Sequence, residues 1–372
     1  MTKQPQKSIT IGTSGPLGAR GGLAPQTPHE TGPRPQISIA GGCREEALYE
    51  ALRIEVAQAR CFKNTPWANC LTMAWITAAY LGGYALLLAD PGWALRLGAV
   101  LVIAFTMVQA GFIAHEAGDG GITSNRFLAS LLGQIYMTLA SGLSRSYFAK
   151  FHRLHHAHLE GRASGAGGTS QTINAYEGAT LKRWLSRNGA VFIVVLTCLR
   201  GFTFKAESLR YLWRERKTTA TDQVFMALHL VLWLVVPVAI LGVADGALNF
   251  VLVTLLAGPY VGTVLLINHV GMTMARSQEG IPMLRRQTMA TRNLGPSRWA
   301  GFVFGGINNH IEHHLFPDIP TANLPRARSI TQDFFLRHGI PYRETSYLGA
   351  LADIAAYFGK LSRRQLANES FA

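Results

Sequence analysis

The side chains best suited to chemistry in this sequence are its histidines, most of which fall into short, regularly spaced groups. One group is His152, His155 and His156 in HRLHHAH, and another is His310, His313 and His314 in HIEHHLFP. Residues at positions i, i+3 and i+4 share one face of a helix. Each HxxHH group is therefore predicted to present three imidazoles to a single point.

Two single histidines stand where long apolar runs end. His115 begins the sequence HEAGD, and His269 closes the last long apolar run. Together with the two HxxHH groups, they are enough to surround a pair of metal ions. Imidazole suits iron, zinc, copper and nickel, so the ligand type alone does not choose the metal.

The other histidines are expected to take no direct part in such a site. His29 lies in a polar N-terminal stretch and is predicted to be solvated. His229, inside an apolar run, is expected to make a satisfied polar contact between helices. His338 is expected at the surface. His158 is expected either beside the ligands or exposed, without being a ligand itself.

The composition indicates a membrane protein. Of the 372 residues, 48% are hydrophobic and only 15% are charged, and the mean hydropathy is +0.16. Soluble domains usually carry about 25% charged residues. A net charge of +14 would suit nucleic acid on a soluble fold. Here the Lys and Arg residues lie between apolar runs, which is typical of membrane proteins and argues against nucleic acid as a partner.

Four apolar runs are long enough to cross a bilayer. They are Trp67–Leu88, Trp93–Ala114, Val224–Val243 and Gly246–Asn268. Short turns at Asp90-Pro91-Gly92 and Ala244-Asp245 join them in pairs, which predicts an all-α membrane protein with two transmembrane hairpins. Both turns are nearly free of Lys and Arg. The positive-inside rule therefore places the termini and the stretch between the hairpins in the cytoplasm.

Two further apolar stretches are too short to cross a bilayer. Phe127–Ser141 has about 15 residues, fewer than the roughly 20 that span a bilayer. It must not cross if all the histidine groups are to meet on one side, so we expect it to be re-entrant or buried. Ala190–Leu199 is shorter still and is expected at the membrane interface.

Four regions follow from this pattern. Residues 1–43 are rich in Gly, Pro, Thr, Ser and Gln and predict a disordered tail. Residues 44–64 predict an amphipathic helix lying on the membrane or on the rest of the protein. Residues 65–345 hold the membrane domain with a cytoplasmic, histidine-rich helical cap. Residues 346–372 predict a C-terminal helix or tail.

The histidine groups resemble the three histidine boxes of the integral membrane fatty acid desaturases. That family carries HxxxH at the end of its second span, HxxHH shortly after it, and HxxHH near its C-terminus. The sequence HIEHHLFPDIP, followed by NLPRAR, is especially similar to the acyl desaturases, whose third box is close to QIEHHLFPxxP. The resemblance runs from about Trp67 to Arg328.

The resemblance implies a centre of two iron ions (Fe2+/Fe3+) that uses O2 to desaturate a fatty acyl chain. Carried over residue by residue, it implies that the metal ligands are His115, His152, His155, His156, His269, His310, His313 and His314. It implies no catalytic residue beyond the metal centre and no other cofactor site. The acyl chain is expected in an apolar tunnel that is lined by the spans and ends near the metals.

One departure from the family lies in the first box, where this chain has Asp119 in place of the second histidine. Asp119 lies one helical turn from His115 on the same face. Three interpretations stay open. Asp119 replaces the imidazole as a ligand, it holds a ligand by a hydrogen bond, or it marks a site with altered or lost activity. Glu116 points to another face and is expected to be a supporting or structural residue.

Desaturation needs two electrons from outside the enzyme. The sequence has no GxGxxG motif that opens a helix and no cysteine cluster. We therefore expect a separate ferredoxin-like or haem-containing carrier, which a basic face would steer if the carrier is acidic. The same face suits acyl-CoA, acyl carrier protein or acyl lipid as the source of the chain. Arg145, Lys150 and Arg153 are candidates for these contacts, and Gly161–Ser170 predicts a flexible loop.

Two other functions remain open on this pattern. The same scaffold carries hydroxylases, acetylenases and carotenoid oxygenases, which product analysis distinguishes from a desaturase. A non-catalytic metal-binding homologue is the other alternative, and Asp119 is the only feature that favours it. The Gly- and Ala-rich composition, without a fused haem domain, suggests a bacterial inner-membrane protein.

Overall fold

The computed structural model describes residues 39–369, except for residue 91 and the segments 158–188 and 273–280. Residues 38–372 form one compact unit. The predicted tail as far as residue 38, the loop Gly161–Ser170, and both His29 and His158 lie outside the described residues.

Helices account for almost all of the regular structure. In chain order the elements are α1 (Ile39–Gln58), α2 (Pro66–Leu88), α3 (Trp93–Asp119), α4 (Arg126–Leu132), the π-helical η1 (Gly133–Ala140), α5 (Arg145–Ala157), α8 (Gly189–Arg214), α9 (Ala220–Leu230), the π-helical η2 (Val231–Val235), α10 (Val236–Leu241), α11 (Val243–Ile267), α12 (Met283–Ala290), β1 (Asn293–Leu294), α13 (Arg298–Val303), α14 (His310–Leu315), the 3-10 helix η3 (Thr321–Asn323), α15 (Leu324–His338), β2 (Glu344–Thr345) and α16 (Tyr347–Glu369). The described residues contain one sheet, in which β1 and β2 pair in parallel.

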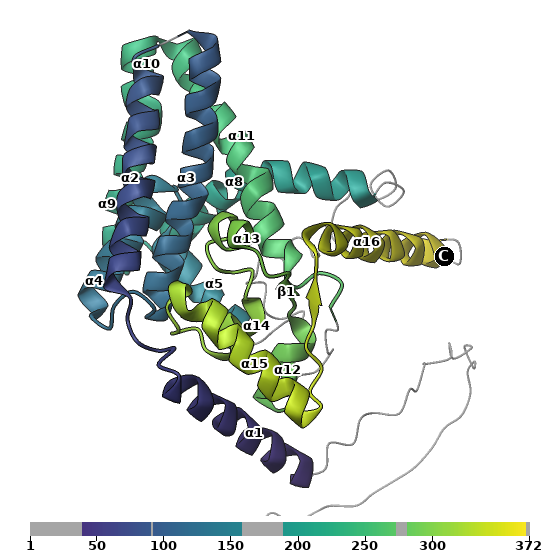
Figure 1. The fold of residues 1–372 in the computed structure, drawn as a ribbon. Coiled ribbons are helices and arrows are strands. Elements are labelled where there is room, and N and C mark those ends of the chain that lie inside the picture. The colour runs from purple at the N-terminus through teal and green to yellow at the C-terminus, as the bar shows by residue number, and fades with distance from the viewer. Residues whose placement is uncertain (1–38, 91, 158–188, 273–280, 370–372) are drawn as a thin grey trace, which may run out of the picture. The chain divides into compact units, whose positions relative to one another are not determined.

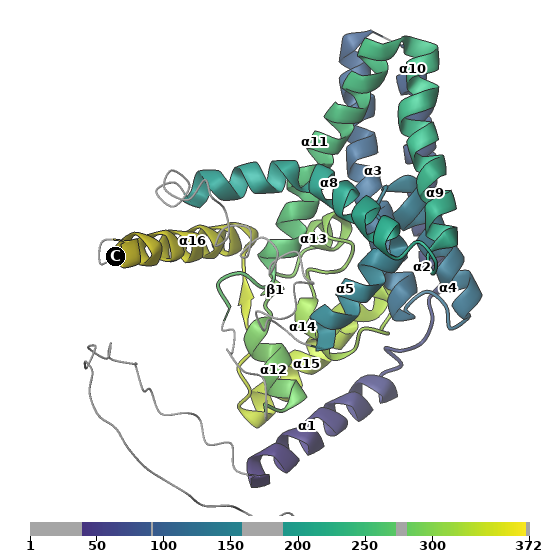
Figure 2. The same cartoon turned by 180° about the vertical axis from the view of Figure 1, so that it is seen from behind.

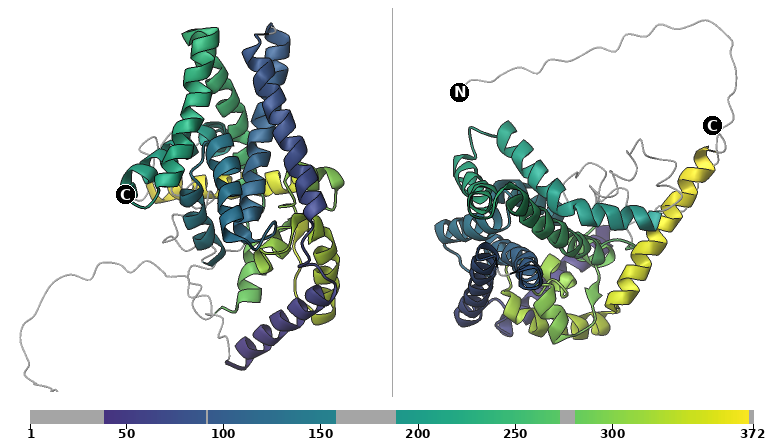
Figure 3. Two further views of the ribbon diagram at one scale, coloured as in Figure 1. Left: turned by 90° about the vertical axis from the view of Figure 1, so that its left-hand side faces the viewer. Right: turned by 90° about the horizontal axis from the view of Figure 1, so that it is seen from above.

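Four helical segments are long and apolar enough to cross a membrane, as the sequence predicted. They are α2, α3, the continuous run Ala220–Leu241 formed by α9, η2 and α10, and α11. Figure 1 and the left panel of Figure 3 show them as two antiparallel hairpins standing side by side. The second span differs from its predicted end at Ala114, because α3 continues to Asp119. His115 and Asp119 therefore both lie on the helix itself.

Glycine makes both hairpin turns possible. Gly92 and Gly242 precede α3 and α11 with φ angles of 83° and 84°, a region that side chains with a Cβ rarely adopt. Arg96 then ties the two turns together, because its guanidinium donates to both Asp90 and Asp245. These two ion pairs thus connect the turn of the first hairpin to the turn of the second.

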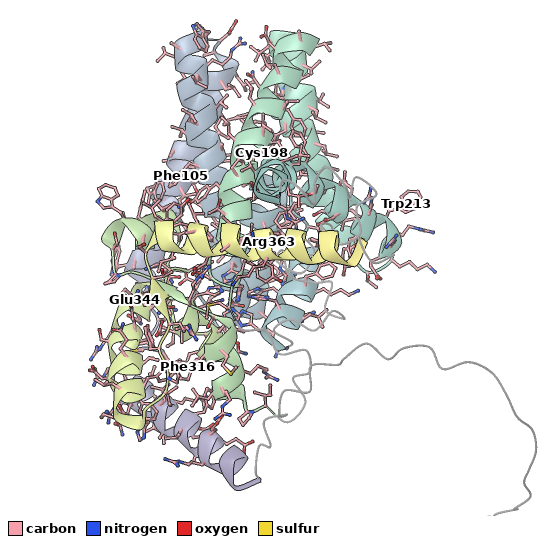
Figure 4. The ribbon with its side chains drawn as sticks, turned by 90° about the vertical axis from the view of Figure 1, so that its right-hand side faces the viewer. Phe105, Cys198, Trp213, Phe316, Glu344 and Arg363 are labelled. Carbon is pink, nitrogen blue, oxygen red and sulfur yellow. The ribbon has the colours of Figure 1, made fainter. Side chains whose placement is uncertain are left out.

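The helix α8 packs closely along α11 through small residues. A Cβ added to Gly258 would lie 2.3 Å from the carbonyl oxygen of Cys198, and one added to Gly262 would lie 2.9 Å from Thr197. Small residues at such a crossing let helix backbones approach closely. The element is also longer than the apolar stretch Ala190–Leu199 suggested, because amphipathic residues extend it to Arg214. Cys198 marks its position in Figure 4.

The ambiguous stretch Phe127–Ser141 is helical and does not continue straight. It forms α4 and η1, after which the chain bends by 109° into α5. Figures 1 and 2 show α4 and α5 at the end of the bundle where α3 ends. This arrangement agrees with a re-entrant segment, and it returns the second histidine group to the end of α3 that carries His115.

A single buried carboxylate holds this bend. Asp222, at the start of α9, accepts hydrogen bonds from the Gln134 side chain at 2.7 Å and the Ser144 hydroxyl at 2.7 Å. It also accepts from the backbone N–H and the hydroxyl of Ser146, each at 2.8 Å. Its donors come from both sides of the bend, so Asp222 fixes the angle between η1 and α5.

The remaining helices form a cap at the same end of the bundle. The predicted amphipathic helix begins at Ile39, earlier than residue 44, and it lies on the rest of the protein. Leu52 and Val56 are fully buried with Phe316 and Phe334 in the core of the cap. Figures 1 and 4 show α16 extending outward beside the bundle, at a level between the spans and this core.

We expect Asp222→Ala to lower the free energy of unfolding by roughly 3 kcal/mol or more, because it leaves several buried donors without an acceptor. Unfolding of the detergent-solubilised protein would measure this loss. Asp245→Ala is the matched control, since its ion pair with Arg96 is 44% exposed on the aspartate side. Exposed pairs contribute about 1 kcal/mol or less. Equal losses in both variants would contradict the assigned role of Asp222.

Candidate metal centre

Nine candidate ligands named from the sequence meet at one place in the structure. They come from α3 (His115, Asp119), α5 (His152, His155, His156), the residues just after α11 (His269), and α14 (His310, His313, His314). Both HxxHH groups are helical, as their spacing predicted. The α3, α5 and α14 rings are in mutual contact, with the His115 and His313 centroids 4.8 Å apart and those of His156 and His314 4.5 Å apart.

The first of two four-residue groups consists entirely of histidines. It contains His155, His269, His310 and His314, whose ligand atoms all lie within 4.8 Å of one another. The Nε2 atom of His310 is 2.7 Å from that of His269 and 3.1 Å from that of His314. Three ring nitrogens that approach so closely are directed at one small volume.

The second group contains the carboxylate of the first box. His115, Asp119, His152 and His313 bring their ligand atoms within 4.8 Å of one another. Asp119 oxygens lie 3.2 Å from His152 Nε2, 3.6 Å from His115 Nδ1 and 3.9 Å from His313 Nε2. The carboxylate therefore faces the same point as the three imidazoles.

His156 lies between the two groups. Its Nε2 atom is 3.0 Å from that of His152 in the second group. Its ring is 4.5 Å from that of His314 in the first group and 4.9 Å from that of His313 in the second. It belongs to neither four-residue group, but its position gives it access to both.

The electrostatics of the cluster suit a bound cation. Burial, followed by repulsion from neighbouring imidazoles, lowers the pKa of His155, His310 and His314 well below the ordinary 6.5. Burial lowers the pKa of His152 and His269 to about 4. These rings are therefore neutral at pH 7, the form that binds metal.

Several ring nitrogens also have no partner within the part of the chain that is described. The Nδ1 atoms of His156 and His310 and the Nε2 atom of His313 are buried without a hydrogen bond. Buried polar atoms are nearly always satisfied. On the rings of His156 and His310 the Nε2 atoms crowd against other imidazoles while Nδ1 has no partner, so the cluster leaves ring nitrogens unsatisfied. Such a set of neutral imidazoles fits a metal site, because a cation would bind the lone pairs that the neighbouring rings cannot satisfy.

Two residues of helix α12 orient two of the imidazoles by accepting hydrogen bonds from their Nδ1 atoms. Buried Gln287 accepts from His314 Nδ1 at 3.0 Å, and its own amide donates to the carbonyl of His156 at 3.0 Å. The carbonyl of Ala290 accepts from His269 Nδ1 at 3.0 Å. An acceptor at Nδ1 leaves Nε2 unprotonated and directed inward. Gln287 is not among the residues predicted from the sequence, because no spacing pattern connects it with the histidine boxes.

A second buried network supports the third box. Glu312 is fully buried and accepts from Asn293 at 2.7 Å and from the hydroxyl of Tyr342 at 2.9 Å. The side-chain oxygen of Asn293 in turn accepts from the backbone of Ile311 at 2.8 Å. Residues on both sides of α14 therefore hold it in place.

Other sequence predictions about polar residues can be compared directly. Glu116 belongs to neither group and accepts from the backbone of Thr321 at 2.8 Å, which agrees with the supporting or structural role expected. His229 is buried with both ring nitrogens in contact, and His338 is exposed, as predicted. Lys150 is exposed beside Glu215, at 3.9 Å.

A largely apolar cavity of about 180 Å³ lies against the cluster. Its wall includes Met107, Val108, Phe112, Leu143, Phe148, Phe151, Phe204, Val261 and Val264, together with His115, His152, His155, His269, His310 and His313. The predicted apolar space beside the histidines is therefore present. Two cationic residues of α8, Arg200 and Lys205, also line it.

The sequence as a whole settles the family. The profile of the fatty acid desaturase family matches residues 91–346, a stretch that contains all nine candidate ligands. The chain belongs to the fatty acid desaturase family. It is therefore a membrane-embedded oxidoreductase that acts on a lipid acyl chain.

Curated relatives of this desaturase carry desaturase names. Fatty acid desaturase 3 of Bos taurus is 26% identical over 349 residues, covering 90% of this chain and 75% of that protein. Delta(5) fatty acid desaturase fat-4 of Caenorhabditis elegans is 26% identical over 275 residues, with 68% and 60% covered. Acyl-lipid (9-3)-desaturase of Physcomitrium patens is 25% identical over 282 residues, with 68% and 52% covered.

We expect Gln287→Met to lower the affinity of the desaturase for metal by about 10- to 100-fold, the usual effect of removing a partner that orients a ligand. Competition with a chelator during loading with Fe2+ would measure this. Gln109→Met is the matched control, because Gln109 is also buried and donates to the Tyr260 hydroxyl at 2.8 Å, away from the rings. A similar loss in both variants would indicate general destabilisation.

Proposed function

We propose that the two groups of ligands hold two iron ions and that the desaturase uses O2 to insert a double bond into an acyl chain. The observation that carries this proposal is the convergence of eight histidines and Asp119 beside an apolar cavity, whose wall includes six of those histidines. When bound, the irons would supply the activation of O2 needed to remove hydrogen from an unactivated methylene. The reaction removes two hydrogen atoms and reduces O2 to two waters, so it consumes two electrons and two protons.

The protein's own residues would orient and protect this chemistry. The cavity's apolar side chains, Phe148 and Phe151 among them, hold the acyl chain and exclude water. Gln287 and the Ala290 carbonyl fix the rings of His314 and His269, so that the ligands need little reorganisation.

Asp119 acts in this proposal as a metal ligand rather than as a hydrogen-bonding support. Its oxygens face nitrogens of His115, His152 and His313, which is the position that a fourth ligand of the group would take. Carboxylates are common iron ligands. A carboxylate would lower the positive charge of this iron relative to the other, which has only imidazoles in its group.

The proposal includes a location and partners. The cap would face the cytoplasm, because the hairpin turns are poor in Lys and Arg while the stretch between them is rich in both. The Gly- and Ala-rich composition is the basis for proposing a bacterial inner membrane. A separate ferredoxin-like or haem carrier would supply electrons. The basic residues Arg145, Lys150 and Arg153 would contact this carrier or the polar part of acyl-CoA, acyl carrier protein or acyl lipid.

We expect wild-type protein to purify with about two irons per chain and to convert an acyl substrate into a product two hydrogens lighter. His155→Ala and His313→Ala should each lose iron and activity, because each removes a ligand from one group. Elemental analysis and mass spectrometry of the products measure both. His338→Ala is the control, since that ring is exposed and remote from the cluster. Zinc alone would refute the di-iron centre, and a product with an added oxygen would refute desaturation.

Asp119→Ala should lower the iron content towards one per chain, whereas Asp119→His, which restores the family's first box, should keep both irons. The physical reason is that a carboxylate and an imidazole each supply a ligand atom, and a methyl group supplies none. Iron content after anaerobic loading distinguishes the variants. Full iron occupancy in Asp119→Ala would show that Asp119 is not a metal ligand and only supports the ligands by hydrogen bonding.

A further inference from the structure

An ammonium group stands in the wall of the apolar cavity. Lys205 lies on α8 on the same face as Gly201 and Phe204, and all three line the cavity. Its Nζ atom also contacts His229 in the span Ala220–Leu241 and lies 5.9 Å from the ring of Phe250 in α11. Lys205 is therefore packed against the third and fourth candidate spans.

The protein satisfies two of the three donors of this ammonium. Nζ donates to the carbonyl of Ser141 at 2.8 Å and lies 3.0 Å from Nε2 of His229. Nδ1 of His229 is 2.7 Å from the carbonyl of Leu139, so this nitrogen carries the proton and Nε2 accepts from Lys205. One N–H of Lys205 remains for the cavity.

No carboxylate forms an ion pair with Lys205 within the described ranges. Glu207 pairs with the neighbouring Arg200 at 3.3 Å, and Asp222 is already occupied by Gln134, Ser144 and Ser146. A buried cation without a counter-charge is costly. Burial lowers the pKa of Lys205 to about 7, which agrees with this lack of compensation.

The backbone leaves room for the ammonium at this point. Gly142 has a φ of 67°, and a Cβ there would lie 2.3 Å from both Lys205 Nζ and His229 Nε2. Glycine is thus required at position 142 for two reasons, its φ and the space taken by the lysine.

We propose that Lys205 binds a carboxyl-derived oxygen of the acyl substrate, either a free carboxylate or the carbonyl oxygen of an ester or thioester, while the alkyl chain extends along the apolar wall towards the histidines. The identity of the ligand rests on the proposed function. The cavity's composition supports the assignment: an amphiphile with one polar end and a long apolar part matches a wall with one uncompensated cation and many apolar side chains.

The test compares three ligands of equal chain length, namely myristate, methyl myristate and tetradecane. Each displaces a fluorescent alkyl probe from the full-length protein, as purified, in nanodiscs. Lys205→Met should weaken myristate binding by about 10-fold or more, the effect of a lost charge-assisted hydrogen bond, and leave tetradecane unchanged. An equal loss for methyl myristate would identify the carbonyl as the recognised group, and a smaller loss would identify the carboxylate.

Control variants separate recognition from folding. Lys205→Arg keeps the charge and should keep the preference for myristate over tetradecane, and Lys217→Met alters only an exposed lysine beyond the end of α8. Equal weakening of all three ligands in Lys205→Met would show a purely structural role, and no weakening would also overturn the proposal. Because displacement requires no turnover, a failure of the proposed function would appear in the iron and product analysis instead.

Discussion

Nine candidate metal ligands on segments far apart in the chain must reach the same end of a helix bundle without leaving polar backbone in the membrane. Each hairpin places candidate ligands at the end of its second helix. His115 and Asp119 lie at the end of α3, and His269 lies just after α11. The second histidine group can join them only if the chain between α3 and α5 turns back. The bend of 109° after η1 and its buried Asp222 anchor provide that turn. The arrangement of the cap follows from this requirement.

Close packing of imidazoles creates an energetic problem that the fold resolves locally. Neutral rings with nitrogens 2.7–3.1 Å apart cannot all satisfy one another, because each tautomer has only one donor and one acceptor. Gln287 and the Ala290 carbonyl fix the tautomers of His314 and His269, because each accepts a hydrogen bond from the Nδ1 atom of its ring. The nitrogens left over point inward, where a cation would satisfy them.

Local patterns predicted a large part of this structure. Uninterrupted apolar runs located the four spans, and the i, i+3, i+4 spacing identified both helical histidine groups. Even the short stretch Phe127–Ser141 was recognised as unusual, because its length does not match a bilayer. These features depend on residues near each other in the sequence, which is why a pattern can find them.

Long-range contacts could not be predicted in the same way. Gln287 lies 131 positions from the carbonyl that it contacts at His156, and Asp222 lies 88 positions from Gln134. Neither residue belongs to a motif, and each looks like an ordinary polar residue until its partner is known. Lys205 is similar, since only packing against His229 and the cavity distinguishes it from the other basic residues of α8.

The small sheet has a consequence for how the enzyme is made. The strand β1, just before the third box, pairs with β2 at residues 344–345, and Tyr342 in the same late segment supports Glu312 within that box. A ribosome synthesises the third histidine group before it synthesises these supports. A chain interrupted between residues 314 and 342 would therefore contain every candidate ligand but lack part of the support of α14. Full ordering of the candidate metal centre therefore requires residues 342–345, and truncation before them would leave a protein that has every candidate ligand but lacks these supports of the third box.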